Sequence, residues 1–563
     1  MRRSLRWMAL MSSVALVVTM AAGCGGGGGK SSKSKGHRGG TFTILAHTAP
    51  SGGPDPAINY TLQYWQLLID THDGLVAFKR SGGKEGTKIV PDLATSIPKP
   101  TGGGKTWTFK LRRNIKYSNG TVMKPSDFKR TFERMFVVKG PTAGTFYKVF
   151  IGADKCLKPG AKTCDLSQAI VPDDKNYTLT FHLTGSDPEF LDKLGVPFAF
   201  ALPPSTPQKE VAIAPPGTGP YKFVTYSPRQ EIKLVRNPFF KEWSKDAQPN
   251  GNPDTIVEKI GLTVEAEVTQ IENGQADALS GADQVPADRL PELSSKYSSL
   301  VHVNPLTAVW YMAFNVRVPP FNNLKARQGV NFATDHNALV KIYGGPKLAQ
   351  PTCQILPPNF PGYKPYCPYT KSPGSKWSAP DLAKAQQLIN ASGTKGAAVK
   401  VNTDTNEVDK AIGLYFVGLL NKLGYKAQLQ ALSTDIQYTF CQNSKNKVQF
   451  CFSSWYQDYP AASDFLNVLL GCGSYVPNSD ASPNISEYCD PSTQAKMDQA
   501  LKLGFTDQAK ANTIWTQVDK QVVDNAVWVP LFNPKFVDLL GKQVKGYLFS
   551  PQWYFLIDQA SVQ

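Results

Sequence analysis

Eight cysteines in four close pairs place the strongest constraint on how this sequence can fold. The chain has 563 residues and nine cysteines, of which Cys24 lies near the N-terminus. The other eight follow one another as Cys156 and Cys164, Cys353 and Cys367, Cys441 and Cys451, and Cys472 and Cys489. Eight cysteines allow on the order of 100 pairings, but joining neighbours closes the shortest loops at the least entropy cost. We therefore expect four local structural disulfides in an oxidising compartment, rather than zinc sites, which need closer cysteine spacing or histidines.

The N-terminus has the pattern of an export signal. A short basic segment (residues 1–6) precedes a mostly apolar stretch (residues 7–22) that is shorter than the roughly 20 residues of a membrane-spanning helix. Ala21, Ala22 and Gly23 then precede Cys24, as in a bacterial lipobox, although the usual leucine is replaced by Ala21. We expect a signal peptide over residues 1–23 and lipidation at Cys24. The alternative is a plain signal with an incidental cysteine.

The segment that follows predicts a flexible tether. Residues 24–40 are rich in Gly, Ser and Lys and lack an apolar anchor, so they suit a lipid-anchored protein whose body must reach past the membrane surface. Residues 1–40 carry seven basic and no acidic residues, which leaves +10 of the formal net charge of +17 for the rest of the chain, a moderate excess. No long basic run follows Arg38. The charge therefore does not indicate a partner among nucleic acids.

The body of the chain predicts a mixed α/β fold. Alternating or continuous apolar runs predict strands at residues 41–46, 107–112, 177–183, 448–453 and 526–532. Apolar residues at helical spacing predict helices at residues 60–70, 331–342, 381–391, 409–423 and 515–523, and another that begins near Pro125 with Asp127 as a cap. Residues 202–220 are rich in Pro and Gly and predict a crossing segment at a sub-domain boundary.

Motifs for catalysis or metal binding are not found. Residues 101–106 (Thr-Gly-Gly-Gly-Lys-Thr) look like a phosphate loop, but Lys99 stands where that motif needs glycine, and a strand pattern follows. There is no Gly-x-Ser-x-Gly or His-Glu-x-x-His sequence, and the histidines are scattered singly. We expect no enzyme activity, no cofactor and no metal. A secreted hydrolase that uses unassigned carboxylates remains the alternative from a different class.

Short motifs follow one another in a fixed order along the body. They are Pro-Asp-Leu-Ala (91–94), Trp-Thr-Phe-Lys-Leu-Arg (107–112), Lys-Tyr-Ser-Asn-Gly (116–120), Ser-Asp-Phe (126–128), Gly-Thr-Gly-Pro-Tyr (217–221), Leu-Val-Arg-Asn-Pro (234–238), Phe-Asn-Asn-Leu-Lys-Ala-Arg-Gln-Gly-Val (321–330), Ala-Thr-Asp (333–335), Asp-Leu-Ala-Lys-Ala (381–385) and Trp-Tyr-Gln-Asp-Tyr-Pro (455–460). Each motif is weak alone. In this order and spacing, over residues 41–563, the chain resembles the extracytoplasmic solute-binding proteins of ABC importers, family 5 (oligopeptide and dipeptide binders).

The resemblance implies an α/β fold of the two-lobed periplasmic-binding-protein type II (Venus flytrap), with an inserted sub-domain in the first lobe. It implies lobe I at residues 41–304 with the sub-domain at about 81–215, lobe II at 305–525, and a C-terminal return to lobe I at 526–563. Ligand would be enclosed by hinge closure.

The resemblance also implies the function and the place. We expect a monomer, anchored by its lipid to the outer face of the bacterial cell membrane (periplasmic or cell-surface), that captures peptides and delivers them to the permease subunits of an ABC transporter. The alternatives are the same fold binding a metal chelate, an oligosaccharide or another small molecule, or a receptor that senses peptides without transport.

The ligand site implied by the resemblance lies at residues 455–459. In peptide-binding members an aspartate pairs with the peptide α-ammonium and a tryptophan lines a side-chain pocket; here these are Asp458 and Trp455. Tyr456 and Tyr459 are further candidates. The alternatives are that Asp458 is a turn or cap residue and that Trp455 packs in the core. Some oligopeptide binders hold the peptide carboxylate with an arginine three residues before the tryptophan, where this chain has Phe452.

Overall fold

The computed structural model describes residues 37–49, 53–158, 160–281, 283–286, 288–480 and 482–563. The predicted signal peptide (residues 1–23), the predicted lipidation site Cys24 and most of the predicted tether lie outside these ranges. Within them, no helix combines the length and the apolar character needed to cross a membrane.

One sheet has five strands in the order β10-β1-β9-β8-β7. Its elements and the helices near it are β1 (Thr41–Ala46), β7 (Tyr221–Ser227), β8 (Glu231–Arg236), β9 (Thr255–Ile260), β10 (Ala278–Leu279), α1 (Leu62–Thr71), α5 (Val264–Glu272) and α6 (Leu290–Lys296). Strand β1 runs parallel to both of its neighbours. Its side chains alternate between two cores: Phe42 and Ile44 pack with Tyr64 of α1, and Leu45 packs with Val268 of α5.

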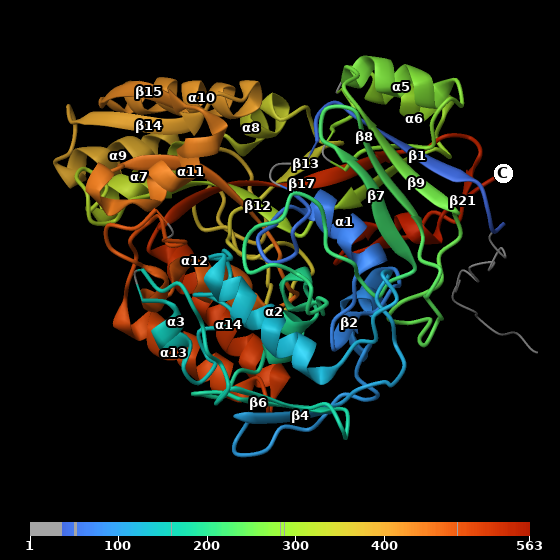
Figure 1. Cartoon of the computed structure of the whole chain (residues 1–563). Helices are drawn as coiled ribbons and strands as arrows, with labels where there is room; N and C mark the ends of the chain where they lie inside the picture. The colour runs from blue at the N-terminus through green and yellow to red at the C-terminus, as the bar shows by residue number, and fades with distance from the viewer. Residues whose placement is uncertain (1–36, 50–52, 159, 282, 287, 481) are drawn as a thin grey trace, which may run out of the picture. The chain divides into compact units, whose positions relative to one another are not determined.

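A second sheet has seven strands, and both of its faces are covered by helices. The strands are β11 (Val301–Pro305), β12 (Ala308–Phe314), β13 (Ala349–Pro351), β14 (Ala398–Asp404), β15 (Lys426–Leu432), β16 (Phe450–Tyr456) and β17 (Trp528–Leu539). The helices are α7 (Leu324–Ala333), α8 (His336–Ile342), α9 (Leu382–Ser392), α10 (Glu407–Leu423), α11 (Thr434–Gln442), α12 (Ala462–Leu470), α13 (Pro491–Leu503) and α14 (Gln508–Asp524). Trp310 and Met312 of β12 enter the core of α7–α10, whereas Val309 and Tyr311 enter the core of α12–α14. Figure 1 shows these two groups of helices apart from each other.

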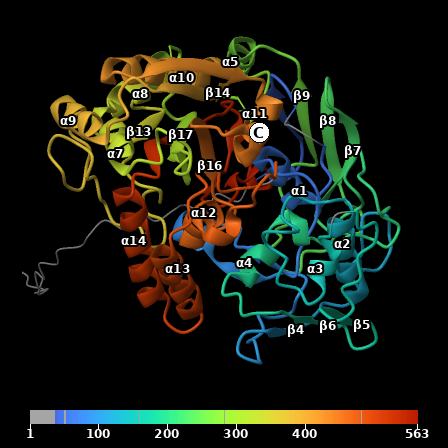
Figure 2. The same cartoon turned by 90° about the vertical axis from the view of Figure 1, so that its left-hand side faces the viewer.

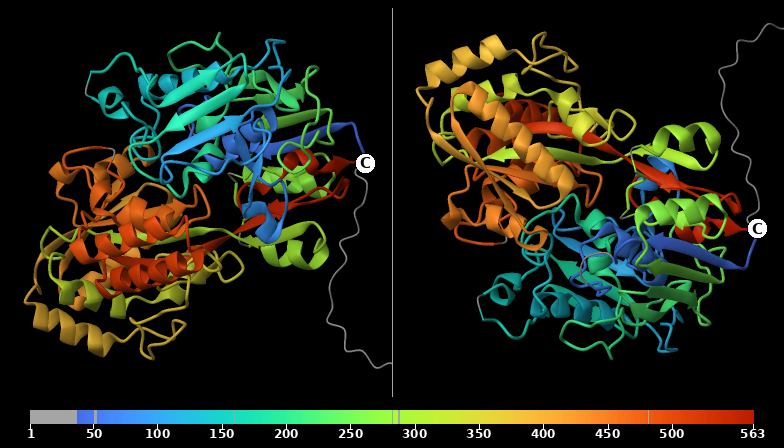
Figure 3. Two further views of the ribbon diagram at one scale, coloured as in Figure 1. Left: turned by 90° about the horizontal axis from the view of Figure 1, so that it is seen from below. Right: turned by 90° about the horizontal axis from the view of Figure 1, so that it is seen from above.

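Strand β17 connects the two sheets. Its first half pairs with β12 and β13, and its second half pairs with β11. Leu540 then forms a bridge to Ala278 of β10 in the first sheet. Figure 3 shows β17 as one long strand that runs between the two groups of elements.

The tail of the chain packs on the first sheet. It contains β18 (Val544–Lys545), β19 (Phe549–Ser550), β20 (Tyr554–Phe555) and β21 (Ser561–Val562). Val544 and Phe555 join the core of Phe42. The sequence places the start of the return to lobe I at residue 526, whereas the hydrogen-bond ladder keeps Trp528–Leu539 in the second sheet.

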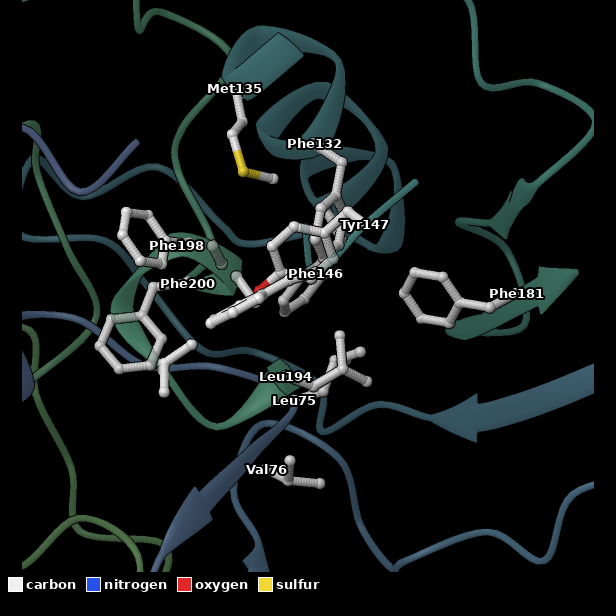
Figure 4. Close-up of a cluster of buried hydrophobic side chains, with 14 of the residues drawn as sticks. Leu75, Val76, Phe132, Met135, Phe146, Tyr147, Phe181, Leu194, Phe198 and Phe200 are labelled. Atoms are coloured by element: carbon white, nitrogen blue, oxygen red, sulfur yellow. The ribbon is translucent and has the colours of Figure 1, made fainter. Parts of the chain in front are cut away.

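A further hydrophobic core is built mostly from residues 57–201. Its elements are β2 (Val76–Phe78), β3 (Ile89–Pro91), β4 (Thr106–Lys110), β5 (Ile170–Asp173), β6 (Thr178–His182), α2 (Pro125–Val137), α3 (Ala153–Cys156) and α4 (Phe190–Leu194). Strands β4, β6 and β5 form a small antiparallel sheet, visible at the lower edge of Figure 2. The ring of Phe132 lies 5.1 Å from that of Tyr147 (Figure 4). This core also takes in Trp65 and Leu68 of α1, and the sub-domain boundaries remain a prediction.

The predicted elements are present with two notable differences. The single helix predicted over residues 331–342 is wrong, because α7 ends at Ala333 and α8 begins after Asp335. The Asp335 carboxylate accepts hydrogen bonds from the backbone N–H groups of Asn337 and Ala338 (3.0 and 3.1 Å), so this residue starts a new helix. The strand predicted at residues 448–453 continues to Tyr456, because it pairs with β12 along its whole length.

The expected cap at Asp127 of α2 is confirmed. Its carboxylate accepts a hydrogen bond from the backbone N–H of Lys124 at 2.9 Å.

All four predicted disulfides are present. Cys156 pairs with Cys164, Cys353 with Cys367, Cys441 with Cys451, and Cys472 with Cys489. The third bridge joins α11 to β16 and so crosses between two elements of the second sheet region. Short-range pairing was therefore the correct choice among the many connectivities.

Removing the bridge between α11 and β16 should lower stability. We expect the double variant Cys441→Ser/Cys451→Ser to lose about 2–4 kcal/mol of unfolding free energy, because the unfolded chain regains loop entropy. Urea unfolding followed by circular dichroism measures this. The control is Thr439→Ala, an exposed residue of α11 whose hydroxyl donates to the carbonyl of Ile436 one turn earlier; this change should alter the free energy by less than about 0.5 kcal/mol. Equal midpoints for the double variant and the wild type would contradict the expectation.

Candidate functional site

A cavity of about 450 Å³ lies where elements of the two sheets meet. Its walls come from the start of α1, the loop after β10, the end of β16 with the residues that follow it, β17 and the tail. The lining residues are Tyr60, Thr61, Leu62, Gln63, Trp65, Gly281, Asp283, Gln284, Leu306, Tyr343, Tyr438, Ser454, Trp455, Tyr456, Gln457, Asp458, Phe536, Val537, Gln552 and Tyr554. The volume is within the usual range of small-molecule sites, about 300–1,000 Å³.

Asp458, the main candidate from the sequence, lines this cavity. Its Oδ2 accepts a hydrogen bond from the Tyr60 hydroxyl at 2.5 Å. Its backbone N–H donates to Asp464 Oδ2 at 2.9 Å, and its carbonyl accepts from Gln552 Nε2 at 2.8 Å. The partners lie just before α1, in α12 and in the C-terminal tail, so three separate parts of the chain hold Asp458 in place.

The carboxyl groups of Asp458 and Asp464 form a buried acidic pair. Burial raises the pKa of Asp458 to about 7, and the hydrogen bonds with Tyr60 and Asp464 lower it only in part. Burial, and then the negative charge of Asp458, raise the pKa of Asp464 well above its usual value. Asp464 Oδ1 has no hydrogen-bond partner. Two adjacent buried carboxylates repel each other, so a cation beside them would favour the ionised form.

Trp455 and Tyr456 also line the cavity, at the end of β16. Trp455 is half-buried, packs against the core of α12–α14, and has an Nε1–H group without a hydrogen-bond partner. Tyr456 is 42% exposed and places its ring edge-on to Trp310, with centroids 5.2 Å apart. Trp455 therefore packs against this core and also lines the cavity, and its role in binding a ligand stays a prediction.

Tyr459, a further candidate from the sequence, is not among the residues that line the cavity, and its role in binding stays a prediction. Its side chain is buried, and its ring lies 5.6 Å from Phe146. Its hydroxyl donates to Glu189 Oε2 at 3.4 Å, and the Lys193 ammonium lies 5.8 Å from its ring. The turn after Asp458 directs this side chain into the neighbouring core, where Ser463 also donates to Glu189. Tyr459 thus packs the segment just before α12 against the residues at the start of α4.

Phe452 lies in the core and not in the cavity wall. It is 4% exposed and pairs in register with Met312 of β12. The side chain joins the core of α7–α10.

Several lining residues were not predicted from the sequence. Tyr60 is the most informative, because it bonds to Asp458 across 398 positions of the chain. Asp283 and Gln552 are also lining residues from distant segments. No local pattern marks these positions, since only the meeting of the two sheets brings them together.

A metal site would need several ligand side chains close together in the part of the chain that the structure describes. No three His, Cys, Asp or Glu side chains lie there in an arrangement that could hold a metal ion. The expected lack of a metal or cofactor stays a prediction.

Comparisons with known proteins give consistent matches. The model of the family "Bacterial extracellular solute-binding proteins, family 5 Middle" matches residues 88–476. The probable D,D-dipeptide-binding periplasmic protein DdpA of Escherichia coli (strain K12) is 24% identical over 530 residues, which cover 90% of this chain and 91% of that protein.

Solved structures show the same fold. The structure of clavulanic acid biosynthesis oligopeptide binding protein 2 superposes with a TM-score of 0.83 at 23% identity. The alignment covers 93% of this chain and 96% of that protein's chain. A second structure is that of the ABC transporter-associated periplasmic binding protein DppA from Helicobacter pylori in complex with peptide STSA. It superposes with a TM-score of 0.73 at 20% identity, and the alignment covers 93% of this chain and 98% of that chain. The fold is therefore the mixed α/β, periplasmic-binding-protein type II fold that the sequence predicted.

Removing the Tyr60 hydroxyl should raise the pKa of Asp458 further. The hydroxyl stabilises the ionised carboxylate, so Tyr60→Phe should move this pKa above its value of about 7. Carboxyl ¹³C shifts of labelled aspartate across a pH titration measure it, with Asp458→Asn to assign the signal. Asp538 is the internal control. Burial also raises its pKa to about 7, but its carboxylate accepts a hydrogen bond from Tyr547 and not from Tyr60, so its pKa should not change. A lower or unchanged Asp458 pKa would be the contrary result.

Proposed function

The chain belongs to the bacterial extracellular solute-binding proteins of family 5, and from this premise we propose that it captures short peptides in the cavity and delivers them to an ABC transporter permease. The peptide class is supported by the names of its relatives, a probable D,D-dipeptide-binding protein and an oligopeptide-binding protein. It is also supported by a structural neighbour that holds the peptide STSA.

The observation that carries the proposal is the Asp458 carboxylate in the cavity wall. A peptide begins with an ammonium group, which is the cation that the pair of Asp458 and Asp464 lacks. A charge-assisted hydrogen bond between the ammonium and Asp458, in a site with little water, is stronger than its neutral counterpart. Trp455 and Tyr456 supply aromatic surface for the first side chains of the peptide.

We propose that lobe I (residues 41–304, with the sub-domain at about 81–215) and lobe II (305–525) close around this peptide. The support is the bond between Tyr60, which precedes α1, and Asp458, which follows β16. A ligand that contacts both groups of elements only in the closed state shifts the population toward closure. We propose residues 526–563 as the C-terminal return to lobe I; its first strand, β17, pairs with strands of the second sheet before the tail reaches the first.

We propose that the protein is a monomer held at the outer face of the bacterial membrane by lipid on Cys24. Its support is the sequence alone: small residues before Cys24 and a Gly/Ser/Lys-rich tether after it. We also propose that the protein is not an enzyme, since the relatives named above are binding proteins. Peptide mixtures should therefore be recovered intact after incubation with it.

Neutralising Asp458 should weaken peptide binding. A hydrogen bond to a charged group contributes about 1.5–3 kcal/mol, so Asp458→Asn should raise the Kd of a free-amine peptide by about 10- to 100-fold. Isothermal titration calorimetry measures this with a peptide identified by mass spectrometry among those the protein retains. The matched control is Asp254→Asn, whose side chain is 67% exposed and lies outside the cavity wall. Unchanged peptide affinity in Asp458→Asn would contradict the pairing of the peptide ammonium with Asp458.

Peptide affinity should also fall below neutral pH. Because the Asp458 pKa is about 7 without ligand, the carboxyl is mostly protonated at pH 5.5, and binding of an ammonium must release that proton. The ligand α-amine, with a usual pKa of about 7.7–8.0, is fully charged at pH 5.5 and mostly charged at pH 7.5, so its own titration changes the affinity little. We expect the Kd at pH 5.5 to exceed that at pH 7.5 by about tenfold or more, and Asp458→Asn to lose most of this dependence. A Kd that is equal at both pH values in the wild type would contradict the role of Asp458.

A further inference from the structure

The charged side chains that line the cavity all have the same sign. Asp283 and Asp458 line it, and among the lining residues that the structure describes there is no Lys, Arg or His. Asp283 Oδ2 accepts a hydrogen bond from the backbone N–H of His47 at 2.8 Å. The His47 ring is held elsewhere, by the carbonyl of Leu262 at 2.6 Å from Nδ1. A carboxylate on a bound ligand would thus meet no cation in this wall.

The amide side chains near Asp458 do not replace the missing cation. Gln457 Nε2 donates to Pro551 O and to Gln552 Oε1, both at 2.9 Å. Gln552 Nε2 donates to the carbonyl of Asp458. Gln63 Nε2, at the opposite wall, donates to Gly281 O at 3.2 Å. Three of the lining amides are therefore engaged with the protein itself, and a buried carboxylate without donors carries a large desolvation cost.

Carboxyl groups also lie near the tyrosine side chains that line the cavity. Burial, and then the negative charge of Asp458, raise the pKa of Tyr438. Burial, and then the negative charge of Asp409, raise the pKa of Tyr343. With Asp464 beside Asp458, a cation in the cavity would favour the ionised form of these carboxyl groups, whereas an anion would disfavour it.

The remaining wall is rich in aromatic rings, which also favour cations. Tyr60, Tyr343, Tyr438, Trp455, Tyr456 and Tyr554 all line the cavity. Ammonium and guanidinium groups over such rings gain about 0.5–2 kcal/mol from the electrons of the ring face. The aromatic lining and the carboxylates therefore favour the same class of ligand.

We propose that the cavity selects short peptides of positive charge whose C-terminal end is neutral, such as C-terminal amides with a basic side chain. The proposal rests on the proposed function and specifies the ligand class of that same site. The amine end pairs with Asp458, a second cationic group is attracted by Asp283, and the neutral end avoids placing an unpaired carboxylate against the two acidic side chains.

A competition between matched peptides tests the proposal. The purified mature protein is incubated with an equimolar mixture of random tripeptides, each present as the free acid and as the C-terminal amide, and retained peptides are quantified by mass spectrometry. We expect amides to be enriched at least tenfold over the matched acids, and Lys- and Arg-containing sequences to be enriched among them. Equal retention, or preference for acids, overturns the proposal while leaving peptide binding intact. Retention of neither form overturns the proposed function itself.

A cation added to the wall should reduce this preference. Gln284 is exposed and lines the cavity, so Gln284→Lys should improve retention of free acids and narrow the amide preference at least threefold. The matched control, Gln508→Lys, adds the same charge at the exposed start of α14, outside the cavity wall, and should leave the preference unchanged. The same narrowing in both variants would show an effect of net charge and overturn the assignment to the cavity.

Discussion

The buried pair of Asp458 and Asp464 is the constraint on which the site depends. Burial disfavours the ionised form of both carboxyl groups, and the negative charge of Asp458 raises the pKa of Asp464 further. The Tyr60 hydroxyl and the Asp458 backbone N–H offset only part of this cost. A positive charge next to the pair would therefore stabilise its ionised form, and the cavity gives a cationic ligand access to the Asp458 carboxylate.

The surrounding fold holds this pair in place from several directions. Strand β16 pairs with β12 along its whole length and is joined to α11 by the bridge between Cys441 and Cys451, so the position of residue 458 is set by a rigid sheet. Gln552 from the tail binds the Asp458 carbonyl. Tyr459, one residue further, is packed beside Phe146 in another core. A ligand contact at Asp458 is thus coupled to both groups of elements that the proposed closure would bring together.

Sequence patterns predicted what depends on neighbouring residues. The disulfides close short loops, and the strand at residues 41–46 has apolar residues at 42 and 44–46, so both were recognisable. The helix predicted over residues 331–342 was wrong, because Asp335 can either continue a helix or cap one, and the packing of α8 on the sheet favours the cap. The side chain of Tyr459 packs in a core and not in the cavity wall, because the direction of a side chain after the end of a strand depends on the turn and not on alternation.

The sequence by itself determined the compartment signals, the disulfide pairs, the α/β class and the resemblance that drew attention to Trp455 and Asp458, since each rests on local composition or on the order of motifs. Only the tertiary structure decided that Tyr60 meets Asp458, that Tyr459 belongs to a core, and that carboxylates line the cavity without a cation among the described lining residues. These features join segments hundreds of positions apart. Their distances and charges arise when the two sheets come together, and no periodicity or motif within one segment encodes them.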